Sequence, residues 1–189
     1  MNKLLSYISL SALVLLTAGC SDDKPKNEHK GLTGYVIEAN YEKKALLVAE
    51  SDKTAKDGSY DAEWYSLNDD AILHDSKNNK VVLTDIEVGS EVETWSTLPS
   101  LESYPSRTDL SKLVVVDDVK HPDSPMLQKK AIQVALAYAK SLSDNSAILL
   151  VQNVTTSKSE WLITVFNTNT EKNYELSINA DTGEVKQIK

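Results

Sequence analysis

Short apolar runs of strand length, separated by turn residues, fill the chain between residues 31 and 119. Several short strands with regular turn signals predict a small β-barrel or β-sandwich. The run 45–49 is apolar throughout, which predicts a strand buried on both faces. In the run 91–95, Val92 and Thr94 alternate with charged or aromatic residues, which predicts one solvated face. The remaining predicted strands lie at residues 33–39, 63–67, 80–83 and 113–116.

The pattern changes at residues 120–125, which contain two prolines. This segment indicates an inter-domain linker or a helix start, with Asp123 or Ser124 as the cap and Pro125 in the first turn. Apolar residues then recur at spacings of three and four, which predicts a helix of about 18 residues with one apolar face that Gln128 largely avoids. That face consists of Leu127, Ala131, Val134, Ala135, Tyr138 and Leu142.

Four further strand-length runs follow the predicted helix, at residues 147–151, 161–166, 174–178 and 184–188. A helix that covers one face of an antiparallel sheet is a natural arrangement for such a segment. The predicted fold is therefore a β plus α/β mix in two small domains. An antiparallel β-barrel or β-sandwich covers residues 31–119, and an α+β domain with one helix on an antiparallel sheet covers residues 123–189.

The amino terminus has the pattern of a secretory signal peptide. Lys3 precedes an uncharged apolar stretch over residues 4–16, and small residues follow up to Cys20. This stretch of about 13 residues is shorter than the roughly 20 that a spanning helix needs. The pattern predicts a signal peptide over residues 1–19 with cleavage between Gly19 and Cys20. Residues 20–30 are polar and mixed in charge, which predicts a flexible tether.

The segment Leu16-Thr17-Ala18-Gly19-Cys20 resembles the lipobox of bacterial lipoproteins. The resemblance implies that the Cys20 thiol carries a diacylglycerol and that a dedicated peptidase cuts before this residue. An ordinary signal peptide with a chance cysteine is the alternative. Two acyl chains give stable membrane anchoring, whereas one short chain gives only marginal binding. We therefore expect a palmitate-type lipid anchor on Cys20, which holds the protein at the extracytoplasmic face of a cell membrane.

The carboxy-terminal half resembles a PepSY-type domain, an extracytoplasmic module of one helix and an antiparallel sheet. The resemblance rests on the segments 130–135, 161–165 and 174–185. In the turn of this last segment, we expect Gly183 at the positive-φ position and the Asp181 side chain bonded to the turn backbone. PepSY domains occur in protease propeptides and in cell-surface proteins, where inhibition of peptidases has been proposed.

The amino-terminal half resembles a YobA-like family of small Gram-positive lipoproteins with an OB-like barrel. The resemblance rests on Gly34-Tyr35-Val36, on the strand pair over residues 86–95 with Gly89 at its turn, and on Glu102-Ser103-Tyr104-Pro105. It implies that residues 31–119 form an OB-like antiparallel β-barrel. The family has no assigned activity, so the resemblance implies a fold and a location.

Charge and composition exclude several classes of partner. The formal net charge is −8, with 28 acidic against 20 basic residues, which excludes nucleic acid as a partner. The single cysteine excludes an internal disulfide. His29, His74 and His121 lack ligand spacing and are expected in exposed loops, so neither a metal nor another cofactor is predicted.

The candidate ligand groove is on the barrel. Glu102 and Tyr104 are predicted to line it, with Trp64 and Trp95 as a stacking platform. The alternative is structural, with the tyrosine ring packed on the barrel end and the tryptophans in the core. We expect a non-catalytic, membrane-anchored binding module for a peptide, a protease or a cell-wall component. The alternative is an envelope-polymer hydrolase that pairs Glu102 with a barrel aspartate.

Overall fold

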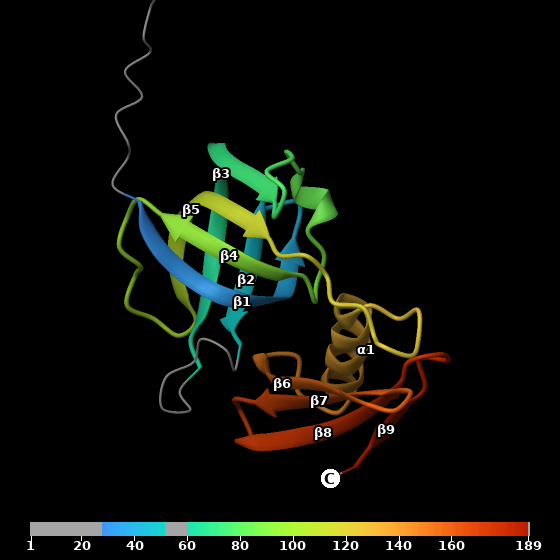
Figure 1. Ribbon diagram of the computed structural model, residues 1–189. Coiled ribbons are helices and arrows are strands. Elements are labelled where there is room, and N and C mark those ends of the chain that lie inside the picture. The colour runs from blue at the N-terminus through green and yellow to red at the C-terminus, as the bar shows by residue number, and fades with distance from the viewer. Residues whose placement is uncertain (1–27, 52–59, 189) are drawn as a thin grey trace, which may run out of the picture.

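The computed structural model describes residues 28–51 and 60–188, which form a barrel, a second sheet and one helix (Figure 1). The predicted signal peptide and the lipid attachment site at Cys20 lie outside the described residues. Within the described residues, no helix is long and apolar enough to cross a membrane.

The predicted small barrel is confirmed as a closed, five-stranded one. Its strands are β1 (His29–Asn40), β2 (Ala45–Glu50), β3 (Ala62–Asp75), β4 (Glu91–Ser96) and β5 (Ser106–Val115). They follow the order β1-β2-β3-β5-β4, and β1 pairs with β4 to close the barrel. Four of these pairings are antiparallel, but β3 and β5 run parallel, which corrects the prediction of a wholly antiparallel barrel. This parallel pairing extends β3 to Asp75 and starts β5 at Ser106, so both strands are longer than the sequence predicts.

The burial of β2 and β4 agrees with their sequence patterns. Leu46 and Val48 of β2 point into the barrel, while Leu47 and Ala49 pack outside it against the second sheet. β2 is therefore buried on both faces, as its apolar run predicts. In β4, Val92 is buried along with Thr94 and Ser96, and the residues between them are partly exposed.

The prediction of a strand at residues 80–83 is wrong. Lys80 makes only an isolated bridge to His74, and a short 3₁₀ helix, η1, occupies Leu83–Asp85. The Asp85 carboxylate accepts a hydrogen bond from the Val82 backbone N–H at 3.1 Å, which stabilises a turn in place of an extended chain.

The predicted α+β arrangement of the second half is confirmed. Its sheet has the order β6-β7-β8-β9 and is antiparallel throughout. The strands are β6 (Leu149–Ser157), β7 (Glu160–Asn167), β8 (Lys172–Asn179) and β9 (Val185–Gln187), and the helix α1 spans Gln128–Ser141. The buried side chains of α1 pack on one face of this sheet, against Trp161, Ile163 and Val165 of β7.

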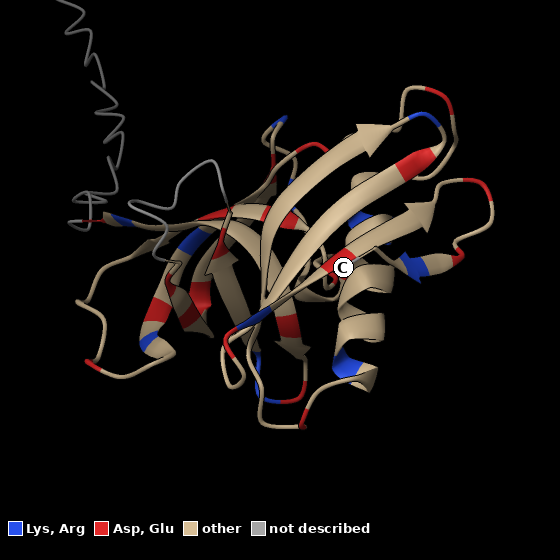
Figure 2. Cartoon of the chain, turned by 90° about the horizontal axis from the view of Figure 1, so that it is seen from below, with Lys and Arg blue, Asp and Glu red and all other residues tan. Residues whose placement is uncertain are grey.

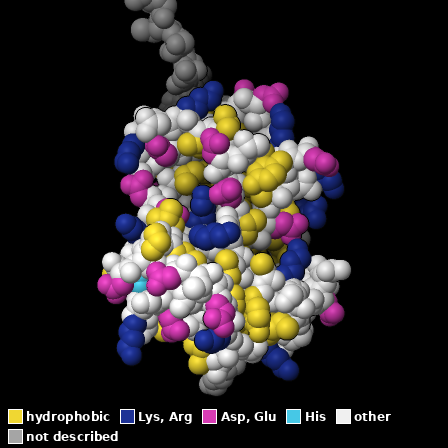
Figure 3. Space-filling model, turned by 90° about the vertical axis from the view of Figure 1, so that its right-hand side faces the viewer, with side chains coloured by type: hydrophobic (Ala, Val, Ile, Leu, Met, Phe, Trp, Pro, Cys, Tyr) yellow, Lys and Arg dark blue, Asp and Glu magenta, His cyan; other side chains and the backbone are white. Residues whose placement is uncertain are grey.

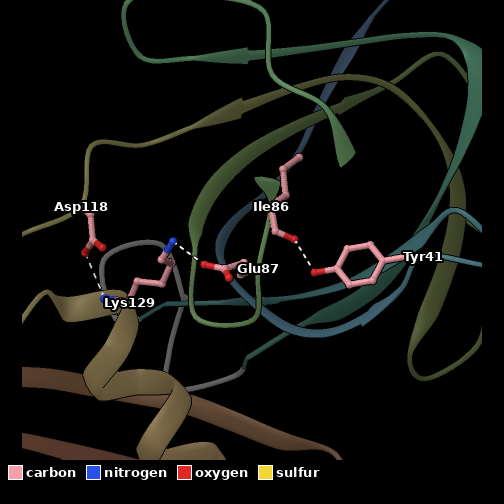
Figure 4. A network of polar contacts seen from close by, with 5 residues as sticks. All are labelled: Tyr41, Ile86, Glu87, Asp118 and Lys129. Carbon is pink, nitrogen blue, oxygen red and sulfur yellow. Dashed lines mark hydrogen bonds and ion pairs between the residues drawn. The ribbon is translucent and has the colours of Figure 1, made fainter. Parts of the chain in front are cut away.

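The start of α1 and its buried face differ from the prediction. The N-cap residue is Leu127, which makes no side-chain cap, and the Asp118 carboxylate accepts a hydrogen bond from the Lys129 backbone N–H at 3.0 Å (Figure 4). Neither Asp123 nor Ser124 caps the helix. The buried face is rotated, because the helix packs against both the sheet and the barrel, and it consists of Gln128, Ala131, Ile132, Ala135, Leu136 and Ala139.

His121 corrects the expectation of exposed loop histidines, because this side chain is only 1% exposed. Its Nδ1 accepts a hydrogen bond from the Asp123 backbone N–H, and its Nε2 lies 3.3 Å from the Glu160 carbonyl oxygen. The ring meets Trp161 edge to face, with 5.4 Å between centroids. The segment after the barrel is therefore packed against the second sheet.

The last hairpin confirms one expectation and corrects another. Gly183 has a φ of +76°, as predicted. The turn backbone is held by Asn179, however, since its Oδ1 accepts hydrogen bonds from the N–H groups of Asp181 and Thr182. Asn179 ends β8, so its side chain reaches both N–H groups of the turn.

The two halves share buried cores. Tyr35 of β1 belongs to the cluster that α1 forms with the second sheet, and the buried Gln128 amide donates a hydrogen bond to the Tyr35 hydroxyl at 3.1 Å. A smaller cluster joins Leu47 of β2 to Leu150 of β6. The barrel and the second sheet therefore pack as one body.

Candidate functional site

An open notch lies where the barrel meets the second sheet. Its volume is about 530 Å³. Tyr60 and Tyr104 line it from the barrel half, and Phe166 lines it from β7. The other lining residues are Leu150, Gln152, Thr168 and Glu171. We call these seven residues the aromatic notch.

Tyr104 is an exposed residue of the aromatic notch, and it is also one of the groove residues predicted from the sequence. Its side chain is 54% exposed, and it lies in the connection between β4 and β5. Partial burial, together with the negative charge of Asp61, raises the pKa of the Tyr104 hydroxyl. The phenol therefore stays neutral near pH 7 and presents an uncharged aromatic face and a hydroxyl to a ligand.

The chemistry of the aromatic notch suits binding. Leu150 is 2% exposed and gives the notch a buried apolar residue. The amide of Gln152, the hydroxyl of Thr168 and the carboxylate of Glu171 are polar groups of the kind that orient a ligand in a pocket. Aromatic faces next to a carboxylate attract a cationic group, because a ring face carries partial negative charge. The lining residues contain one carboxylate and no histidine, cysteine or lysine.

The structure does not bring the four predicted groove residues together. Trp64 lines a separate hollow with Lys43 and Arg107, outside the barrel. Trp95 lies on the outside of β4, with the Lys112 ammonium 4.3 Å and the Lys30 ammonium 5.7 Å from its ring centroid. Glu102 is exposed and is not among the residues that line the notch. Only Tyr104 belongs to the aromatic notch.

The sequence contains only weak indications that the other residues line the notch. Phe166 alternates with the buried side chains of β7, which places it on the face of the sheet away from α1. Glu171 has a φ of +54° in the turn after β7. That these residues meet Tyr104, more than sixty positions away in the chain, follows from the packing of the two halves.

One end of the barrel interior contains a buried polar group around Tyr65. The Tyr65 hydroxyl accepts a hydrogen bond from the Leu32 backbone N–H at 2.9 Å, and the Thr94 hydroxyl donates to the Leu32 carbonyl. Burial, reinforced by the adjacent Glu63, raises the pKa of Tyr65 far above its usual value. Glu63 itself is 4% exposed. These two hydrogen bonds satisfy both backbone groups of Leu32 in β1.

Acidic residues gather at a smaller pocket of about 170 Å³ beside the start of α1. Three of its carboxylates accept hydrogen bonds from the local backbone: Asp75 from Lys77 and Asn79, Asp85 from Val82, and Asp118 from Lys129. The hydrogen bonds from Asn79 hold the pKa of Asp75 below its usual value. No group of three or more potential metal ligands occurs within the described residues. Figure 2 shows acidic residues on several strands and loops of the barrel.

A third hollow, of about 330 Å³, lies at the junction on the side of α1. It is lined mainly by aliphatic side chains, including Ile37, Leu136 and Ile148. Figure 3 shows this side of the molecule, where apolar side chains reach the surface among charged residues of both signs. The aromatic notch differs from this hollow in its three aromatic rings.

Residues 33–117 match the model of a protein family of unknown function, DUF3221. The matched segment runs from β1 to just beyond β5 and coincides with the barrel. It agrees with the resemblance of the amino-terminal half to a YobA-like domain. No match was found among curated proteins or among solved structures.

Proposed function

We propose that this protein is a non-catalytic binding protein, held by a lipid on Cys20 at the extracytoplasmic face of a cell membrane. Its ligand is a peptide segment of an envelope protein, for example a protease, and a cationic side chain of that segment enters the aromatic notch. The observation that carries the proposal is the meeting of Tyr104 and Phe166, from opposite halves, around one open cavity with the carboxylate of Glu171.

The charge of the protein supports a cationic ligand. The chain has a formal net charge of −8, which favours encounter with positively charged segments. Asp61 lies close enough to Tyr104 to raise the pKa of its hydroxyl, and it adds a second negative charge beside the rings. A lysine or arginine side chain over these rings would be attracted both by the ring faces and by the carboxylates.

The resemblances support the location and the class of partner. The lipobox-like segment that ends at Cys20 favours a lipid anchor, and the PepSY-like second half is typical of extracytoplasmic modules proposed to act on peptidases. Replacement of the cysteine by Cys20→Ala should abolish labelling with a lipid precursor and release the protein from membranes. Unchanged attachment of this variant would refute the anchor.

Site-specific cross-linking tests the notch. A photoreactive phenylalanine at position 104 should give a discrete cross-link in whole cells to a lysine- or arginine-containing peptide of an envelope protein. The same residue at position 82 is the matched control, because Val82 is also 54% exposed and lies outside the notch. Phe166→Ala should remove the product at position 104. Identical products at both positions, or a product that survives Phe166→Ala, would contradict the proposal.

The alternative, an envelope-polymer hydrolase that uses Glu102, has less support. A glycosidase-type carboxylate pair needs two carboxyl groups that face one substrate site across roughly 5–10 Å. Glu102 is exposed outside the notch, and Glu171 is the only carboxylate among the residues that line it. Wild-type proteolysis and polymer turnover in the presence of Glu102→Gln would agree with the binding role.

A further inference from the structure

The connection between β4 and β5 begins with an uncharged segment that exposes two leucines. Thr97-Leu98-Pro99-Ser100-Leu101 contains no charged residue. The Leu98 side chain is 54% exposed and that of Leu101 is 67% exposed. We call residues 97–101 the leucine tip. Single exposed apolar residues are common on protein surfaces, but two within four positions form a local apolar patch.

The backbone of the leucine tip is fixed although its side chains are exposed. The Leu98 carbonyl oxygen accepts hydrogen bonds from the hydroxyls of Ser96 at 3.0 Å and of Thr108 at 3.2 Å. The Leu101 N–H donates to the Arg107 carbonyl oxygen at 2.8 Å. The fold therefore holds both leucines outward, which makes their exposure a property of the ordered barrel.

The leucine tip lies beside the start of β1, where the chain enters the barrel. His29 of β1 is paired with Ser96, the residue directly before the tip, and Figure 1 shows the two segments on the same side of the barrel. Only eight residues separate His29 from Cys20, so even a fully extended connection spans about 30 Å. A lipid on Cys20 would therefore keep this end of the barrel close to the membrane.

Trp95 adds the chemistry of a membrane interface. It lies next to the tip on β4, and Lys30 and Lys112 flank its ring from the two neighbouring strands. Tryptophan favours the headgroup region of a bilayer, and lysine side chains extend along apolar surface toward the headgroups. The net negative charge of the chain opposes a flat approach to anionic lipid, which restricts contact to this small uncharged tip.

We propose that the leucine tip inserts into the interfacial region of the lipid bilayer and orients the barrel on the membrane, with Trp95 at the headgroup level. Glu102 marks the end of the inserted segment, because a carboxylate stays in water. This orientation rests on the lipid anchor of the proposed function, and it uses residues distinct from the aromatic notch. It deepens that function by fixing how the notch is presented above the membrane.

An environment-sensitive fluorophore on the lipid-anchored protein tests this inference. Once Cys20 is acylated, a cysteine introduced by Ser100→Cys is the only free thiol, and Asn145→Cys gives the control label on the second domain. The protein is reconstituted into vesicles of phosphatidylethanolamine and phosphatidylglycerol that contain a nitroxide lipid as quencher. We expect the label at position 100 to be quenched about threefold more strongly than the label at position 145.

Paired substitutions identify the side chains responsible. Leu98→Ser with Leu101→Ser should remove the difference in quenching, whereas Val82→Ser with Val119→Ser, which also replaces two exposed apolar residues, should keep it. Equal quenching at positions 100 and 145 in the unsubstituted background would overturn the inference. A change in fluorescence without vesicles that grows with protein concentration would assign the tip to contact between two copies and would also overturn it. Mass spectrometry of Cys20 distinguishes these outcomes from failure of the anchor itself.

Discussion

At the scale of single residues, two glycines with positive φ differ in what surrounds them. Gly89 has a φ of +87°, and a Cβ added there would lie 2.5 Å from the Lys129 carbonyl oxygen of α1. Gly183 has a φ of +76°, and the nearest atom to an added Cβ is the Met126 methyl carbon at 3.8 Å. Backbone conformation requires glycine at both positions, but only Gly89 is also required by close packing.

We therefore predict that Gly89→Ala destabilises the protein more than Gly183→Ala. The left-handed conformation costs an alanine roughly 1–2 kcal/mol, which is the expected loss for Gly183→Ala. Gly89→Ala must also displace α1 from the barrel, so its loss should be about 3 kcal/mol or more. Urea unfolding of the two variants measures the difference. Equal losses in the free energy of unfolding would show that α1 moves away from position 89 at no cost.

The buried Tyr65 hydroxyl makes the free energy of unfolding fall as the pH rises above about 10, the pKa of an ordinary tyrosine. Because the pKa of Tyr65 is raised in the folded protein, the unfolded chain loses this proton first as the pH passes 10. Stability is therefore fully present below pH 10 and falls above it, by about 1.4 kcal/mol at pH 11.

Tyr65→Phe should remove this contribution. Near pH 7 the variant should be less stable by about 1–2 kcal/mol, because the Leu32 N–H loses its acceptor. The gap between the two proteins should narrow by about 1.4 kcal/mol between pH 9 and pH 11 in urea unfolding. A gap that stays constant would mean that Tyr65 ionises equally easily in both states.

At the scale of elements, α1 begins where another segment of the chain satisfies its N–H groups. Gln128 donates its backbone hydrogen bond to the Val119 carbonyl, and Lys129 donates to the Asp118 carboxylate. The Lys129 ammonium also pairs with Glu87 of the barrel half at 2.6 Å (Figure 4). The helix start is thus determined by contacts to residues about ten and forty positions earlier.

Asp118→Ala should destabilise the protein by about 1 kcal/mol, the usual cost of losing a helix cap. Asp118→Asn keeps an oxygen acceptor and should retain most of the stability. Asp123→Ala is the control, because the sequence predicts that Asp123 caps the helix and the structure shows that it does not. This variant should change the free energy of unfolding by less than about 0.5 kcal/mol. Thermal unfolding of the three variants would decide which carboxylate caps α1.

At the scale of the whole molecule, the barrel and the second sheet depend on each other. Leu150 of β6 is 2% exposed and packs with Leu47 and Ala49 of β2. Residues from both halves also share the core around α1. Loss of packing in either cluster should therefore destabilise both the barrel and the second sheet.

We predict that Leu150→Ala lowers the free energy of unfolding by about 2–5 kcal/mol. Amide hydrogen exchange should become faster together in β2 and β7, with a single unfolding transition. Ile72→Ala is the control, because Ile72 is 48% exposed, and it should have little effect. Faster exchange confined to the second sheet would show that the halves unfold independently.

The local sequence was enough to predict elements whose burial follows a simple period. The apolar run of β2, the alternation in β4 and the strands of the second sheet were predicted, as was the positive φ of Gly183. The strand predicted at residues 80–83 was wrong because one side chain, Asp85, stabilises a turn there. The pattern of hydrophobic residues does not predict hydrogen bonds of this kind between a side chain and the nearby backbone.

The sequence by itself determined a β-rich first half of barrel or sandwich type, an α+β second half and the glycine of the last turn, because these depend on the period of the hydrophobic pattern and on local backbone conformation. Only the tertiary structure decided the parallel pairing of β3 with β5, the burial of His121 and Gln128, and the cap on α1. It likewise separated Trp64 and Trp95 from Tyr104 and placed Phe166 beside Tyr104. The physical reason is that these contacts join residues far apart in the chain. They contribute to stability only after the two halves have packed together.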